Sequence, residues 1–232
     1  MKTTVLPVNN YGITAEEFLT PVLLSLRVAF IALILSFVFG TMMAHFMTRK
    51  QFKGKIILET IIMLPIVLPP TVVGFILIVI FGNNGFAGNI VEWIFSQSII
   101  FTWYAAVLAS TVVSLPLMYQ AAKTGFLSID KDIEDAARVD GASNLQVFMK
   151  ITLPLASVSL MTGAILSFAR ALGEFGATLM IAGNIPGRTQ TLPTAIYTAL
   201  QSGNMTLAWL WVITIVVISF IMLLFVRTKS VN

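Results

Sequence analysis

The stretch PVLLSLRVAFIALILSFVFGTMMAHFM (residues 21–47) decides the fold class of this chain. Arg27 is its only Lys, Arg, Asp or Glu, and a helix needs about 20 mostly apolar residues to cross a bilayer. A strand in lipid must belong to a closed barrel, and this run is too long and too uniformly apolar for a barrel strand. The stretch therefore predicts a membrane-spanning helix.

Four further apolar runs follow along the chain, at about residues 56–81, 99–122, 155–181 and 207–226. The whole sequence is 57% hydrophobic and 10% charged, whereas soluble domains carry about 25% charged residues. No internal repeat or linker divides it. We therefore expect an all-α integral membrane protein with five transmembrane helices in a single domain over residues 1–232.

The basic residues of the loops predict the orientation of these helices. The loops after the first, third and fifth runs hold ten Lys and Arg, and the remaining loops with the N-terminal segment hold two. Because basic residues are in excess on the cytoplasmic side, we expect the N-terminus outside and the C-terminus in the cytoplasm. Glu16 and Glu17 precede the first run and no cleavage site follows it, so the first helix should stay attached.

The composition also excludes several classes of function. Without cysteine and with one histidine, the chain cannot form disulfides, thiolate metal sites or a histidine metal cluster. The net charge of +4 does not indicate nucleic-acid binding, because the basic residues lie between apolar runs. The sequence has no Walker motif and no convergent catalytic groups. We expect no enzyme and no metal or cofactor in this chain.

The longest loop on the predicted cytoplasmic side, at about 123–153, is the most informative. It continues as SIDKDIEDAARVDGASNLQVFMKITLP over residues 128–154. Asp130 or Asp132 can cap a helix, Gly141 suits a left-handed turn, and Ser143 can cap a second helix that ends before Pro154. The loop therefore predicts a short helix, a sharp turn and a second helix that leads back into the membrane.

Two features of the first loop helix favour contact with another protein. Glu134 and Arg138 are four residues apart and can pair on an acidic, solvated face. Ile133, Ala137 and Gly141 share another face, where small residues would let a partner's backbone approach. The alternative is an amphipathic loop that rests on its own bundle.

This loop resembles the cytoplasmic EAA loop of bacterial ABC-importer permeases. That pattern is Glu-Ala-Ala, three residues, Gly, nine residues and Ile-x-Leu-Pro; here Asp135 follows the glutamate, and the alanines, the glycine and residues 151–154 match in register. The resemblance implies an ABC type I importer-like transmembrane domain whose loop helix docks on an ATP-binding subunit. The coupling residues that it implies are Glu134, Asp135, Ala136, Ala137 and Gly141.

Three further segments resemble one branch of this permease family. LPIVLPPTVVG (64–74), ARALGEFGA (169–177) and NIPGRTQTLP (184–193) are similar to the molybdate and sulfate permease branch, and the compact length favours molybdate. The resemblance implies molybdate import across the bacterial cytoplasmic (inner) membrane, with sulfate, thiosulfate or tungstate as alternatives. The implied partners are a second copy of the chain, two ATP-binding subunits that hold ATP and Mg, and an extracytoplasmic oxyanion-binding protein.

A stand-alone secondary transporter is the more distant alternative. It would need internal repeats and ion-coupling residues at the midplane, and the sequence offers one charged pair. A membrane enzyme is a third class, and co-purification with an ATPase would separate these classes.

A few residues inside the apolar runs are candidates for the transport pathway or its gate. Arg170 and Glu174 lie one helical turn apart, and a lone arginine at the membrane centre costs at least about 2.5–3.5 kcal/mol. The pair could attract an oxyanion or fix helix packing. Pro65, Pro69 and Pro70 free backbone carbonyls and kink the second helix, which could serve gating or curvature.

Overall fold

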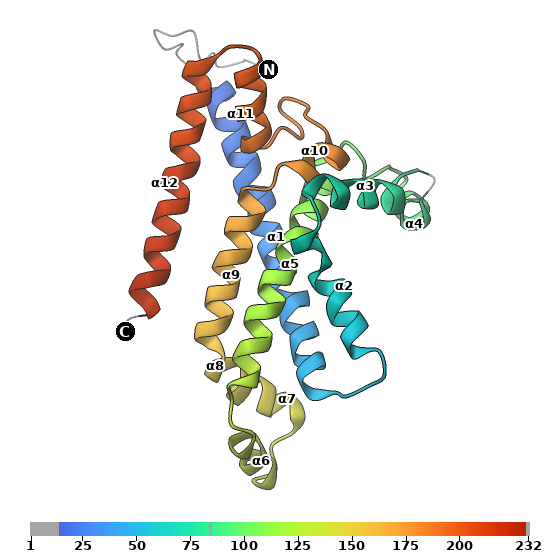
Figure 1. Cartoon of the computed structure of the whole chain (residues 1–232), viewed down its shortest axis with the longest axis vertical. Coiled ribbons are helices and arrows are strands. Elements are labelled where there is room, and N and C mark those ends of the chain that lie inside the picture. The colour runs from blue at the N-terminus through green and yellow to red at the C-terminus, as the bar shows by residue number, and fades with distance from the viewer. Residues whose placement is uncertain (1–13, 84, 231–232) are drawn as a thin grey trace.

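The computed structural model describes residues 14–83 and 85–230, and every regular element in that part is helical (Figure 1). Three helices are long and apolar enough to cross a bilayer alone: α1 (Ala15–Arg49), α5 (Trp103–Leu127) and α12 (Met205–Ser230). They confirm the first, third and fifth predicted helices. The predicted outer N-terminal segment falls largely on residues 1–13, which lie outside the described residues.

The second apolar run forms two helices. α2 (Lys55–Val67) and α3 (Pro70–Phe81) are bent by 119° relative to each other. Pro69 and Pro70 lie at the bend, because proline lacks the N–H that would continue the helix. Pro65 lies inside α2 without breaking it. The break that the prolines predicted in this run is therefore confirmed at Pro69 and Pro70 but not at Pro65, and the count of five spans holds if each bent pair is one span.

The fourth run is also broken. α7 (Asn144–Val147), the π-helix η1 (Phe148–Thr152) and α8 (Leu153–Leu155) lead through a bend of 73° into α9 (Ser157–Leu172). α10 (Gly176–Ala182) starts only after an interruption at 173–175. The prediction of one helix over 155–181 is therefore wrong, and Glu174 lies in the interruption.

The remaining helices lie at the two ends of the molecule. α11 (Leu192–Gln201) lies beside the start of α1, whereas α4 (Phe86–Phe95) follows α3 and projects to one side in the same half of the molecule (Figure 1); neither helix was predicted from the sequence. α6 (Lys131–Val139) and α7 lie at the opposite end, beyond the end of α1 (Figure 1). α1, α5 and α9 connect the two ends.

Small residues let α1, α5 and α9 pack closely. A Cβ built on Gly40 would lie 3.0 Å from Cγ of Met118. The hydroxyl of Ser36 lies 2.7 Å from that of Ser114, and Ser167 donates to the Ser114 carbonyl at 3.1 Å. Close backbone approach and hydroxyl hydrogen bonds hold helices together where lipid removes the hydrophobic drive.

The outward faces of α2 and α12 are apolar and exposed. Ile56 is 80% exposed and Phe220 is 65% exposed, and neighbouring residues on both helices are similar. Lipid or another membrane-embedded chain must cover such surfaces, because water would not tolerate them.

Candidate functional site

The predicted loop helix forms as α6, and local capping explains its ends. Asp130 accepts a hydrogen bond from the backbone N–H of Asp132 at 3.0 Å. Gly141 follows the helix with a φ of 88°, a left-handed conformation that glycine adopts without strain. Its N–H donates to the carbonyl of Arg138 at 3.0 Å. The predicted helix start and glycine turn are both confirmed.

The returning helix begins at a capping box. The hydroxyl of Ser143 accepts from the N–H of Gln146 at 3.3 Å, and the N–H of Ser143 donates to the Gln146 side chain at 2.8 Å. The predicted cap is confirmed. The helix was expected to end before Pro154, but it continues through the π-helical turn to Leu155.

Glu134 points into the protein. Its side chain is 3% exposed and accepts hydrogen bonds from Arg49, at the end of α1, and from the hydroxyl of Thr152 in η1, the latter at 2.6 Å. Arg138, the partner expected from the sequence, lies 4.0 Å from the carboxylate. The expectation that Glu134 lies on a solvated face is therefore wrong, because a cation 85 residues away draws it inward.

The environment of Glu134 keeps it charged. Burial raises the pKa of the carboxyl, but hydrogen bonds from Arg49 and Thr152 and the charges of Arg49 and Arg138 lower it by more. The pKa therefore lies below the ordinary value of 4.5. A carboxylate in this position is ionised at neutral pH and links three segments of the chain.

Asp135, the adjacent acid, points outward. Its side chain is 67% exposed and pairs with Arg138 on the same helix. Counting back from Gly141 along the pattern Glu-Ala-Ala, three residues, Gly places Asp135 at the acidic position. The structure therefore assigns different surroundings to the two acids, with Asp135 open to a partner and Glu134 held inside.

The tip of the molecule also exposes apolar side chains. Ile133 is 48% exposed, Val139 87% and Leu145 70%. Ala136 is exposed and Ala137 is half-buried. Within the described residues, no atom approaches to 4 Å of a Cβ built on Gly141. Exposed apolar and small side chains of this kind can accommodate the backbone of another protein.

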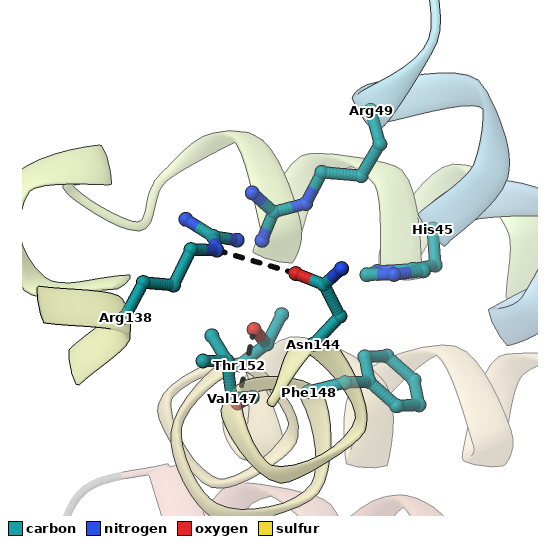
Figure 2. A pocket seen from close by; sticks show the side chains of 7 residues that line it. All are labelled: His45, Arg49, Arg138, Asn144, Val147, Phe148 and Thr152. Carbon is teal, nitrogen blue, oxygen red and sulfur yellow. Dashed lines mark hydrogen bonds between the residues drawn. The ribbon is translucent and has the colours of Figure 1, made fainter. Parts of the chain in front are cut away.

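A pocket of about 260 Å³ lies between the end of α1 and the loop helices (Figure 2). Figure 2 shows the guanidinium groups of Arg49 and Arg138 turned toward each other, with Asn144 between Arg138 and His45. Arg138 donates to the Asn144 amide oxygen at 3.4 Å, and the ring of His45 lies 4.3 Å from that of Phe148. Glu134 pairs with Arg49 and Asp135 pairs with Arg138, so a carboxylate already balances the charge of each arginine in the pocket. In the described part of the chain, no group of His, Asp and Glu could hold a metal ion.

A second polar cluster lies between α2 and α5, beside a pocket of about 490 Å³. Glu59 accepts hydrogen bonds from Lys123 at 2.9 Å and from the hydroxyl of Tyr119 at 3.2 Å. This cluster was not predicted from the sequence. Glu59 could have indicated it, because it is an acidic residue within the second apolar run. An acidic side chain that faces other membrane helices needs a polar or charged partner.

Arg170 and Glu174 do pair, but they do so at the junction of two helices. Arg170 Nη1 lies 2.6 Å from Glu174 Oε2, and the other carboxylate oxygen accepts the N–H of Ala177 at 2.8 Å. The Glu174 side chain is 1% exposed and that of Arg170 is 30% exposed. Glu174 therefore caps the start of α10 and ties it to the end of α9.

The helix that Glu174 caps rests on the bend in the second run. A Cβ on Gly176 would lie 3.0 Å from Cβ of Pro70, and a Cβ on Gly74 would lie 2.9 Å from Cα of Ala177. Such distances leave no room for a side chain. Of the predicted pathway residues, Pro70 lies against Gly176, two residues after Glu174, and Pro65 lies inside α2.

Comparison with known protein families and structures gives consistent results. The family described as "Binding-protein-dependent transport system inner membrane component" matches residues 36–228. The chain is 64% identical, over 95% of its own length and 97% of the relative's, to the putative molybdenum transport system permease protein YvgM of Bacillus subtilis. It is 45% identical, over 78% of its length and 79% of the relative's, to the molybdenum transport system permease protein ModB of Escherichia coli K12.

Among solved structures, a bacterial ABC transporter involved in the import of the acidic polysaccharide alginate has a similar fold. The TM-score is 0.75 at 20% sequence identity, over 94% of this chain and 80% of that one. At this identity the likeness establishes the fold alone.

Proposed function

Because the chain belongs to the family of binding-protein-dependent transport system inner membrane components, we propose that it carries molybdate across the inner membrane as the permease subunit of an ABC importer. Membership in the family places the chain in the inner membrane and among transport subunits rather than catalytic enzymes. The observation that carries the substrate is the 64% identity, over nearly the full length of both chains, to a protein named as a molybdenum permease. Sulfate, thiosulfate and tungstate have less support.

ATP and Mg would be bound by a separate subunit that docks on the α6 tip. Support comes from the exposed apolar residues Ile133, Val139 and Leu145 at that end and from the open space around Gly141. Asp135 would add a charge at the rim of this contact. The residues of the predicted coupling set that fit direct contact are Asp135, Ala136, Ala137 and Gly141.

A second copy of the chain would complete the pathway. The side chain of Arg170 is 30% exposed within a membrane-embedded segment, and a charge that faces lipid is costly. A partner copy or an aqueous pathway between two copies would cover it. Arg170 would then lie beside the path of the anion, with Glu174 balancing its charge and Pro69 and Pro70 permitting α3 and α10 to shift at a gate. An extracytoplasmic oxyanion-binding protein would deliver the substrate at the α10–α11 end.

The test is reconstitution of the chain with its co-purifying ATPase and binding protein in liposomes. We expect molybdate to stimulate ATP hydrolysis and to accumulate inside, with excess sulfate competing weakly. Uptake of sulfate without uptake of molybdate would assign the runner-up substrate. Uptake of either anion by the chain alone, driven by an ion gradient, would overturn the ABC mechanism in favour of a secondary transporter.

A further inference from the structure

The coupling helix α6 is joined to the rest of the chain through one buried side chain. Glu134 is the only residue of α6 that is buried. The remaining residues of the helix are exposed or half-buried, including Asp135 and Arg138. Movement of α6 can therefore reach the membrane helices through Glu134, through the hydrogen bond from Arg138 to Asn144 of α7, or through the backbone links at the two ends of α6.

The contacts of Glu134 lead to two different membrane segments. Arg49 is in the last turn of α1 and binds one carboxylate oxygen. Thr152 donates to the same oxygen at 2.6 Å and is itself 1% exposed. Thr152 ends η1, so the carboxylate touches the first span and the segment that leads, through α8 and a 73° bend, into the helix that carries Arg170.

These contacts are stiff, because charge-assisted hydrogen bonds are shorter and stronger than neutral ones. An ion pair shielded from water is screened less by salt than an exposed pair. From Thr152 the chain passes through α8 and the 73° bend into α9 and reaches Arg170. Arg170 pairs with Glu174, Glu174 accepts the N–H of Ala177 in α10, and Gly176 lies against Pro70 at the bend of the second run. A continuous set of contacts thus runs from α6 to the opposite end of the membrane domain.

We propose that Glu134 is a positioning residue that transmits the movement of α6 to α1 and α9 through Arg49 and Thr152, and that it does not contact the ATPase subunit. This inference rests on the proposed function, because it requires an ATPase that moves α6. The proposal assigns different roles to the two adjacent acidic residues. Asp135 belongs to the docking surface, and Glu134 belongs to the internal joint.

The experiment uses the complete complex of permease, ATPase and binding protein in liposomes, with molybdate as the anion. Three quantities are measured: co-purification of the ATPase, molybdate-stimulated ATP hydrolysis and molybdate uptake per ATP hydrolysed. The variants are Glu134→Gln, Thr152→Val, the charge swap Arg49→Glu with Glu134→Arg, and Asp135→Lys as the matched surface control.

For Glu134→Gln we expect wild-type co-purification of the ATPase and a fall of about tenfold in uptake per ATP, within the usual range of coupling between sites. Thr152→Val removes one hydrogen bond while nearly keeping the side-chain shape, so it should fall between Glu134→Gln and the wild type. The charge swap should recover part of the lost coupling. Asp135→Lys should instead lower co-purification.

Two results would overturn the proposal that Glu134 transmits the movement of α6. One is a Glu134→Gln complex that loses the ATPase as completely as Asp135→Lys does, because Glu134 would then be a docking residue. The other is unchanged uptake per ATP in Glu134→Gln and Thr152→Val, or a charge swap that recovers nothing. A wild-type complex that neither hydrolyses ATP in response to molybdate nor takes it up would instead overturn the proposed function.

Discussion

Arg49, in the last turn of the first membrane helix, forms a hydrogen-bonded ion pair with Glu134, which follows 85 residues later in α6. Neither residue is unusual by itself in the sequence, since basic residues end many membrane helices on the cytoplasmic side. Their pairing attaches the loop helix α6 to the end of the membrane helix α1. It also makes the stability of that region depend on pH.

The pH dependence follows from the lowered pKa of Glu134. A carboxyl whose pKa is lower in the folded state adds stability above its unfolded pKa and loses that contribution as pH falls through the folded pKa. We expect the wild type to unfold at a higher temperature than Glu134→Gln at neutral pH. The difference should begin to shrink below about pH 4.5.

Thermal unfolding of the two proteins in detergent, between neutral pH and about pH 3.5, measures this difference. The other charged or ionisable side chains near Glu134 are Arg49, Arg138, His45 and Asp135, and both proteins share them. Asp135→Asn controls for loss of an exposed acid. A difference that grows as the pH falls would contradict the assigned environment of Glu134.

Substitutions of Gly141 should separate backbone strain from contact with a partner. Left-handed geometry costs an ordinary residue about 1–2 kcal/mol, and asparagine tolerates it better. We therefore expect molybdate-stimulated ATP hydrolysis to fall in the order Gly141→Asn, Gly141→Ala, Gly141→Leu, since leucine adds both strain and bulk. Membrane insertion should be unchanged. If Gly141→Leu retained as much stimulation as Gly141→Asn, the space around this turn would not be needed.

The Arg170–Glu174 pair should behave as a unit. Arg170→Met leaves a carboxylate that is 1% exposed without its cation, which we expect to destabilise the protein by about 3 kcal/mol. Arg170→Met combined with Glu174→Gln should be less destabilised, because a neutral amide can still accept the N–H of Ala177. Thermal unfolding of the single and double variants measures the coupling. Additive effects would mean that the two side chains do not interact.

Close packing of α3 against α10 should make Gly74 sensitive to a single methyl group. In Gly74→Ala the new Cβ would lie 2.7 Å from Cβ of Met180, so we expect a loss of about 1–3 kcal/mol in stability. Gly173→Ala is the matched control, because its nearest neighbour would be 3.5 Å away and its φ is −87°. Equal melting temperatures for the two variants would show that the α3–α10 contact is looser than described.

The orientation can be tested with single cysteines, since the chain has none. Cysteines at the exposed positions Asn83 and Ser128 should react with an impermeant thiol reagent from opposite sides of the membrane. The excess of basic residues predicts that Ser128 is cytoplasmic. Labelling of both from outside would reverse or break the predicted topology.

The sequence predicted well those features that depend on neighbouring residues. Asp130, Gly141 and Ser143 occupy their predicted positions because capping and left-handed turns need only the local chain. The three long helices were also predictable, since a long apolar run has few alternatives in lipid.

The errors concern features that depend on distant residues or on uniform composition. The inward direction of Glu134 required knowing that Arg49 lies beside it. The interruption at 173–175 lies in an apolar run, where hydropathy does not distinguish one helix from two. Gly173 and Gly176 lie at the two edges of the interruption, and Gly176 also packs against Pro70.

The short lengths of α3 and α10 have a consequence for biogenesis. With 12 and 7 residues, each is well below the roughly 20 residues of a spanning helix, so neither can be released stably into lipid alone. The surface of α3 around Gly74 is covered by Ala177, which the ribosome adds about 100 residues later, roughly 5–20 s at typical synthesis rates. During that interval the nascent chain must keep α3 at the insertion machinery or against α5. Synthesis rate and insertase supply should therefore influence how much of this protein matures.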